Sequence, residues 1–324
     1  DGRTLQRNFN YRKLEWTDKD YQLNLTGHFS TGGFDHTLLT GIEYEDYDYK
    51  SIIQRSSAVA GTYPIDIFDP VYGQTRPALT RTPTHDKENL KTYAAFVQDQ
   101  VALTERLKVL AGARFERFEH DYQNYVGKSW QAADNAVTPR VGVIYDLTDT
   151  VAVYADAARS FKPNTGASRE GGGFAPEKGK SYEMGIKWEA LDRQLSVDAA
   201  IYQIEKKNVL TNDPADTTNT FSVAAGQVRS RGFDLNVAGN LTPEWRVIGG
   251  YAYVDAEVTR DNTFRSGTRL MNIPRNSFSL LNVYEFQDGA LKGLGLGAGG
   301  KYVDQRAGQT ANTAFSMDAY TVVD

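Results

Sequence analysis

The chain lacks cysteine, has few histidines and contains no long hydrophobic run. With no cysteine among its 324 residues, disulfide frameworks, cysteine-ligated zinc and thiol catalysis are excluded. No stretch approaches about 18 consecutive apolar residues, which excludes a helical membrane span. Lysine and arginine (36) are outnumbered by aspartate and glutamate (41), and this acidic balance argues against a nucleic-acid partner, which normally requires a basic face.

The histidines do not form a catalytic or metal-binding pattern. His28, His36, His85 and His120 are scattered along the chain, and none has the spacing of a metal-ligand motif such as HExxH. We therefore predict no catalytic residues, no metal ligands and no enzyme activity.

Strict alternation of apolar and polar residues is the dominant pattern in the sequence. Tyr182, Met184, Ile186 and Trp188 alternate with polar or small residues in the segment 181–189. A period of two places the two sets on opposite faces of a β-strand. The same pattern recurs around residues 21–29, 107–116, 141–147, 195–202, 233–238 and 293–298.

Alternation and turn signals predict about fourteen strands. Their approximate spans are 4–16, 20–30, 36–50, 92–104, 107–120, 138–147, 150–161, 180–190, 193–206, 228–240, 244–257, 275–287, 292–303 and 315–324. Most exceed the about five or six residues usual in globular proteins. A strand of about 9–11 residues tilted by about 45° crosses the hydrocarbon core of a bilayer.

The connections between these strands alternate between short and long. Short turns are expected at 30–35, 104–106, 148–150, 190–193, 241–244 and 288–291, and long polar segments at about 51–91, 121–137, 162–179, 207–227, 258–274 and 304–314. One rim of the sheet, the tight rim, therefore has short turns, and the other, the elaborated rim, has long loops. Outer-membrane barrels likewise have short periplasmic turns and long outer loops.

These features predict an all-β, transmembrane, antiparallel up-and-down β-barrel. In lipid, unpaired backbone hydrogen-bond groups cost too much free energy, so the strands must close into a barrel. Successive residues of each strand then face the lipid and the lumen in turn. A soluble sandwich, barrel or propeller also alternates, but favours shorter strands. The polar residues predicted to face the lumen are Arg114, Glu116, Arg140, Asp156, Glu183, Lys187, Asp198 and Asp234.

Several phrases resemble TonB-dependent ferric-siderophore receptors, in particular the ferrichrome and hydroxamate group. They are FDHTLLTGIEY (34–44), FDPVYG (68–73), TYAAFVQDQVAL (92–103), RFE (114–116), SFKP (160–163), PEKGKSYEMGIKWE (176–189) and IPRNSFSLL (273–281). Each phrase alone is weak, but together they follow the family's order over essentially the whole chain.

The resemblance implies a larger protein than this chain. Family members carry an N-terminal plug inside a barrel of about 22 strands, so residues 1–324 are expected to be a partial barrel domain without the plug and some strands. The implied location is the bacterial outer membrane. The implied partners are a ferric siderophore, TonB through the plug, and outer-membrane lipid or lipopolysaccharide, and the barrel is expected to be monomeric.

Aromatic residues on the long segments are the candidate contacts for a siderophore. A ferric siderophore has a mostly organic surface, which favours a concave pocket with aromatic walls. Its iron is already coordinated by the chelator, so no cofactor or metal ligand of the protein's own is expected. The candidates are Tyr63, Phe68, Tyr72, Tyr125, Trp130, Phe161, Phe174 and Phe264.

The sequence thus predicts a receptor segment for TonB-energised uptake of ferric siderophores, with other functions open. A passive porin would share the alternation and loop asymmetry. A receptor for a catecholate siderophore or cobalamin would share the family phrases. A soluble β protein, acting as a binding module or glycosidase, would share only the alternation.

Overall fold

The computed structural model describes residues 2–56, 63–165, 168–213, 215, 221–309 and 312–324. Regular structure in these ranges is β-strand apart from a 3-10 turn at Gly289–Leu291. No helix in the described ranges is long and apolar enough to cross a membrane.

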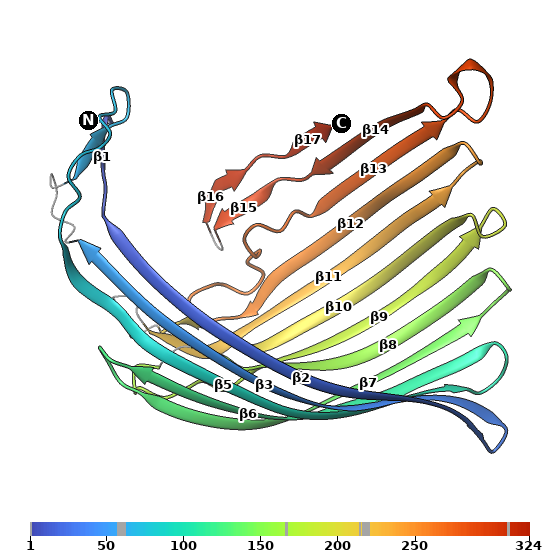
Figure 1. Cartoon of the computed structure of the whole chain (residues 1–324), viewed down its shortest axis with the longest axis horizontal. Coiled ribbons are helices and arrows are strands. Elements are labelled where there is room, and N and C mark those ends of the chain that lie inside the picture. The colour runs from blue at the N-terminus through green and yellow to red at the C-terminus, as the bar shows by residue number, and fades with distance from the viewer. Residues whose placement is uncertain (1, 57–62, 166–167, 214, 216–220, 310–311) are drawn as a thin grey trace.

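Thirteen strands form one antiparallel sheet in the order β17-β14-β13-β12-β11-β10-β9-β8-β7-β6-β5-β3-β2. Figure 1 shows this sheet curving like a trough, with neighbours in sequence lying side by side. The sheet is open in the described residues, with β2 and β17 at its edges. The strands are β2 (Asn10–Thr31), β3 (Phe34–Ser56), β5 (Leu79–Ala102), β6 (Leu107–Asn124), β7 (Trp130–Asp146), β8 (Val151–Lys162), β9 (Glu177–Ala190), β10 (Leu195–Asn212), β11 (Ser222–Asn240), β12 (Trp245–Arg260), β13 (Asn276–Glu285), β14 (Gly295–Val303) and β17 (Tyr320–Val323).

Two small ribbons lie outside the large sheet. β1 (Thr4–Gln6) pairs with β4 (Pro64–Asp66), and β15 (Arg306–Gln309) pairs with β16 (Asn312–Met317). One rim of the sheet is tight, as the sequence predicts. The shortest turn there is Gly32-Gly33, where both residues have positive φ (60° and 87°), a conformation that glycine adopts without steric cost.

The strand register divides the sheet into two faces of different chemistry. Directly opposed residues lie on one face, and successive residues lie on opposite faces. We call the face that carries Tyr182, Met184, Ile186 and Trp188 the apolar face, and alternate residues of Leu195–Ile201 on β10 lie on it too. Glu183 and Lys187 lie on the opposite face, which we call the polar face. The four apolar side chains are 39–55% exposed, so they point away from any compact core.

Aromatic residues bound the apolar face at both ends of the strands. Tyr21, Tyr44 and Tyr93 lie directly opposite one another, with ring centroids 6.3 Å and 5.1 Å apart. Eight residues further along β2, Phe29 lies near the tight rim. At about 3.4 Å per residue and a tilt of about 40°, this spacing corresponds to a band about 20 Å high, close to the about 25 Å apolar band of outer-membrane barrels.

The structure corrects several predictions about strand boundaries. The expected strand 4–16 is divided between β1 and β2, and β2 continues through the expected strand 20–30, since Thr17, Asp18 and Lys19 pair with β3 in unbroken register. The expected strand 315–324 is divided between β16 and β17, and β15 lies in the segment expected at 304–314. The long segment expected at 121–137 shrinks to residues 125–129, and β3 and β5 extend into the segment expected at 51–91. Above the aromatic row both faces mix polar and apolar residues, so pairing continues where alternation no longer reveals it.

Adjacent alanines on β10 test the assignment of the two faces. Ala199 lies on the apolar face between Ile186 and Leu235, whereas Ala200 lies on the polar face between Gly185 and Asp234. Lysine at a lipid-facing midplane position costs about 2–4 kcal/mol. We expect Ala199→Lys in the full-length protein to lower the free energy of unfolding from phospholipid vesicles by that amount, and Ala200→Lys to lower it much less. Equal losses would contradict the assignment.

Candidate functional site

An ion-pair cluster centred on Arg114 joins two strands on the polar face across a third. Its Nη2 lies 2.7 Å from Glu43 Oε1, its Nη1 donates to Glu43 Oε2 at 3.1 Å, and its Nε donates to Glu116 Oε2 at 2.8 Å. Glu43 belongs to β3 and Arg114 to β6, so the guanidinium reaches across β5 at the small, buried Ala94. A two-pronged pair of this kind fixes both distance and orientation.

A second polar cluster covers β8 and β9. Tyr154 Oη donates to Glu183 Oε1 at 2.6 Å, and Asp156 lies directly opposite Glu183. The tyrosine ring crosses Gly185, where an added Cβ would lie 2.7 Å from Tyr154 Cε1. A side chain at position 185 would therefore displace the ring and its hydrogen bond.

All eight residues predicted to face the lumen lie on the polar face. The register places Arg114, Glu116, Arg140, Asp156, Glu183, Lys187, Asp198 and Asp234 there. That this face encloses a lumen remains a prediction, because the sheet of the described residues is open.

Three candidate aromatics lie in the connection between β3 and β5. Arg7 places its guanidinium 4.0 Å from the centroid of the Tyr63 ring, which ties the start of the chain to this connection. Phe68 and Tyr72 follow β4 and are 76% and 78% exposed. These two rings are available to a ligand from solvent.

The remaining loop candidates have mixed surroundings. Tyr125 is exposed and packs against His85, with ring centroids 4.5 Å apart. Phe174 and Phe264 are half-buried in the β8–β9 and β12–β13 connections. Phe161 lies within β8 opposite Lys178, and alternation places it on the apolar face. No ring contact within the described part of the chain joins two of the eight candidates.

Trp130 is a wall residue rather than the loop residue that the sequence suggested. It begins β7, is 7% exposed, and its ring centroid lies 4.4 Å from that of His120 and 5.5 Å from that of Tyr122. A Cβ added to Gly173 would lie 2.6 Å from Trp130 Cζ3. The indole thus supports the β8–β9 connection from the wall.

Sequence reasoning missed a buried polar group beside Trp130. His120 Nε2 lies 2.5 Å from Glu88 Oε1, and the His120 side chain is 1% exposed. Tyr122 Oη donates to Asp86 Oδ2 at 3.1 Å, and burial raises the pKa of the Asp86 carboxyl. The spacing of Phe118, His120 and Tyr122 by two was the available signal, but the predicted strand stopped at residue 120, so Tyr122 and Trp130 were assigned to a loop.

A pair of aromatic residues on the polar face, the exposed Trp16 and the half-buried Tyr49, was also missed. Trp16 lies directly opposite Tyr49 and is 66% exposed. The ring of Tyr49 stacks with that of Tyr47, with centroids 6.5 Å apart. These rings lie above the aromatic row that bounds the apolar band, on the face predicted to line the lumen.

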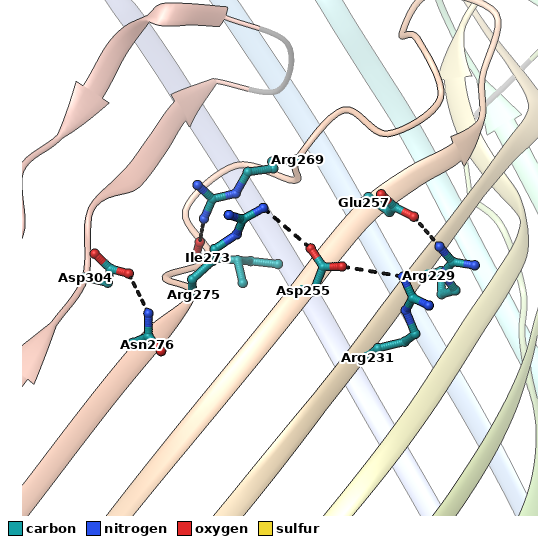
Figure 2. A network of polar contacts seen from close by, with 9 residues as sticks. All are labelled: Arg229, Arg231, Asp255, Glu257, Arg269, Ile273, Arg275, Asn276 and Asp304. Carbon is teal, nitrogen blue, oxygen red and sulfur yellow. Dashed lines mark hydrogen bonds and ion pairs between the residues drawn. The ribbon is translucent and has the colours of Figure 1, made fainter.

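A network on the apolar face, above its aromatic residues, fixes the β12–β13 connection (Figure 2). Arg229 pairs with Glu257, and Asp255 lies between Arg231 (3.6 Å) and Arg275 (3.9 Å). These pairs link β11, β12 and the residue before β13. The connection that carries Phe264 is therefore held at both ends to the wall.

The described residues contain no group of three or more histidine, aspartate or glutamate side chains placed to hold a metal ion. What the polar face offers instead is aromatic surface, arginine and carboxylate groups.

Comparison with known proteins identifies the family. The whole chain, residues 1–324, matches the family described as TonB dependent receptor-like, beta-barrel. The chain belongs to this family. Its members are outer-membrane proteins, and the outer membrane is accordingly the location of this receptor segment.

Curated relatives of this receptor segment are receptors and transporters rather than enzymes. The metal-pseudopaline receptor CntO of Pseudomonas aeruginosa strain UCBPP-PA14 is 43% identical over all of this chain and 46% of its own length. The ferrichrome outer membrane transporter/phage receptor of Escherichia coli K12 is 34% identical over 96% of this chain and 41% of its own. The chain therefore spans less than half the length of these relatives.

Solved structures agree on the fold. The ferric preacinetobactin receptor BauA of Acinetobacter baumannii superposes with a TM-score of 0.82 at 22% identity, covering 99% of this chain and 48% of that protein. The closed form of the ferric-catecholate import receptor Fiu of E. coli K12 gives a TM-score of 0.80 at 22% identity, over 96% and 48%. At this identity the likeness concerns the fold alone.

Substitutions at the adjacent Gly172 and Gly173 test whether Trp130 supports the β8–β9 connection. We expect Gly173→Ala to push the connection off the indole, because overpacking of this kind costs about 1–3 kcal/mol. Tryptic cleavage of the folded full-length protein at Arg169 should then be faster. Gly172→Ala is the matched control, since its nearest neighbour would be Ser168 Oγ at 3.9 Å. Equal cleavage rates in both variants would contradict the contact.

The raised pKa of Asp86 makes a pH-dependent contribution to stability. A carboxyl whose pKa is raised by burial is most favourable to folding when protonated, so its destabilising effect is present at neutral pH and fades as pH falls through the folded-state pKa. We expect Asp86→Asn to be at least as stable as the wild type at pH 7, and the wild type to gain on the variant between pH 7 and pH 4. Denaturant unfolding of the full-length protein over this range measures the difference, and a parallel pH profile would contradict it.

Proposed function

We propose that the full-length protein imports a metal–chelator complex across the outer membrane, with energy delivered through TonB. The observation that carries this proposal is a two-faced wall whose outer apolar band matches a bilayer, in a chain that belongs to the TonB-dependent receptor family. The polar face, with Trp16, Tyr49 and the exposed Phe68 and Tyr72 above the band, would contact the complex.

The wall supplies rigidity rather than chemistry. Arg114 pairs with Glu116 on its own strand and with Glu43 across β5, which ties β6 to β3, so the polar face keeps its shape when something inside it moves. We assign the TonB-driven conformational change to the plug domain, which membership of the family implies. Iron or another metal enters as part of the cargo, so no resident cofactor is needed.

The cargo is proposed to be a metallophore complex. The metal-pseudopaline receptors share more identity with this chain than the ferrichrome transporter does, which favours a metallophore of that class. A ferric hydroxamate, suggested by the sequence phrases and supported by the ferrichrome and ferrioxamine B relatives, is the second candidate. The catecholate receptors are less similar.

Uptake by cells tests this function. The full-length receptor is expressed in a strain without its own siderophore and metallophore receptors, with and without TonB. Radiolabelled metal-pseudopaline, ferrichrome, ferrioxamine B and a ferric catecholate are supplied in turn. We expect saturable, TonB-dependent uptake, strongest for metal-pseudopaline.

Two outcomes would contradict the proposal. Uptake that is unsaturable and independent of TonB, together with steady ion conductance of the purified protein in planar bilayers, would identify a passive porin. TonB-dependent uptake of cobalamin alone would assign a different cargo. Uptake of ferrichrome but not metal-pseudopaline would reverse the order of the two candidates.

A further inference from the structure

Five arginines gather at the upper ends of β2, β3 and β5. Arg12, Arg55 and Arg81 lie on these strands, and Arg7 and Arg76 on the adjoining segments. Arg7 packs on Tyr63 and donates to Gln74 Oε1 at 3.0 Å, and Arg76 lies 5.3 Å from the centroid of the Phe9 ring. In the described part of the chain, none of the five has a carboxylate within ion-pair distance.

The three strand arginines, which we call the arginine rim, point to the polar face. Arg12 and Gln22 are an even number of residues apart along the unbroken strand β2, so they lie on the same face. This is the polar face, because Gln22 lies opposite Glu43, which pairs with Arg114. Arg55 lies opposite Asn10, two residues from Arg12 on the same face. Arg81 lies opposite Arg55, and the register shifts on both sides of this pair. The step from Ile53 to Arg55 on β3 is matched by the longer step from Thr84 to Arg81 on β5, so the extra residue of this bulge brings Arg81 to the face of Arg55. All three side chains are exposed.

This placement leaves like charges facing each other. Directly opposed cross-strand residues have Cβ atoms about 4.5–5.5 Å apart, and like charges there are destabilising. On β5, the first carboxylate below the arginine rim belongs to Asp86, which accepts a hydrogen bond from the Tyr122 hydroxyl. Asp86 lies opposite Ser51. Ser51 is the next residue of β3 on the same face after Ile53, which lies opposite Arg12. An anion between Arg55 and Arg81 would relieve the repulsion.

An aromatic floor lies beneath the arginine rim. Trp16 and Tyr49 are opposite each other on the same face, four residues below Arg12 along β2. At about 3.4 Å per residue this is about 14 Å, within reach of one ligand once the long arginine side chains are included. Forked guanidinium donors above and rings below match a chelate with carboxylates and an organic body.

The occupant is a solute rather than a lipid headgroup. The apolar face is the face assigned to lipid, and its basic residues above the aromatic row on these strands are Lys13, Lys19, Lys50, Lys87 and Lys91. The arginine rim is on the opposite face of the same three strands. A membrane phosphate would have to pass the edge of the wall to reach it.

We propose that Arg12, Arg55 and Arg81 receive the carboxylates of an anionic metal chelate as it enters the polar side of the wall. This rests on the proposed function and narrows it from metal chelates in general to those that carry carboxylate groups. Rim charges act mainly on the association rate and its salt dependence, so the arginine rim would concentrate the chelate above Trp16 and Tyr49.

Citrate, a metal-free tricarboxylate, is the probe for this site. Its binding to the purified full-length protein in detergent is measured by calorimetry for the wild type and for the triple variant Arg12→Gln, Arg55→Gln, Arg81→Gln. We expect the variant to bind at least about tenfold more weakly, since each exposed charge pair accounts for up to about fivefold. Wild-type binding should weaken with added salt, and the uncharged trimethyl ester of citrate should not bind.

The matched control removes the same charge from the same strands on the opposite face. Lys19→Gln, Lys50→Gln, Lys91→Gln should bind citrate as the wild type does. Thermal unfolding followed by circular dichroism checks that both triple variants are folded. No citrate binding by the wild type, or equal losses in the two triple variants, would overturn the proposal.

Two further readouts separate the alternatives. Binding of lipid A micelles that depends on the three arginines, without citrate binding, would assign the rim to the membrane and overturn the proposal. Failure of the full-length protein to import any chelate would remove the proposed function only. Loss of citrate binding in the arginine variant would still support a carboxylate site.

Discussion

Complete pairing of backbone hydrogen-bond groups in a medium without water is the constraint on which this structure depends. A sheet that crosses a bilayer must pair every strand with a neighbour on each side. One of its faces must contact lipid and the other must contact water. Between the edge strands β2 and β17, the described strands satisfy this with unbroken antiparallel register over most of their length, a bounded apolar band on one face and a polar network on the other. The short turns at one rim follow from the same need, because consecutive antiparallel strands are joined with least exposed backbone by tight hairpins.

Above the apolar band the constraint relaxes, and the wall becomes a surface for recognition. Water can satisfy either face there, so the strands are free to carry arginine, carboxylate and aromatic residues on both sides. On the polar face this yields the arginine rim, the floor of Trp16 and Tyr49, and the buried group of His120, Glu88 and Trp130. Placing these residues on strands holds them more rigidly than loops would, which favours a preorganised site.

Much of the membrane-level wall was predictable, and much of the wall above it was not. All eight residues expected on the polar side share one face, because alternation is strong wherever one face must be apolar. The extensions of β2, β3, β6 and β7 escaped prediction, because residues such as Thr17 to Lys19 are polar on both faces and resemble a turn. Trp130 was assigned to a loop for that reason. Trp16 and Tyr49 were passed over as ligand candidates, since the search was confined to the expected loops.

Local periodicity alone determined the two-faced strands, the tight turns and the side on which strand residues lie wherever the register is unbroken, since the period of two is a property of consecutive residues. Which residues meet across strands was decided only in the folded sheet. The pairing of Arg55 with Arg81, the reach of Arg114 over β5 to Glu43, and the contact of Gly173 with Trp130 all join positions far apart in sequence. Register depends on the pairing of whole strands, and a shift by one residue would exchange the faces and dissolve every one of these contacts.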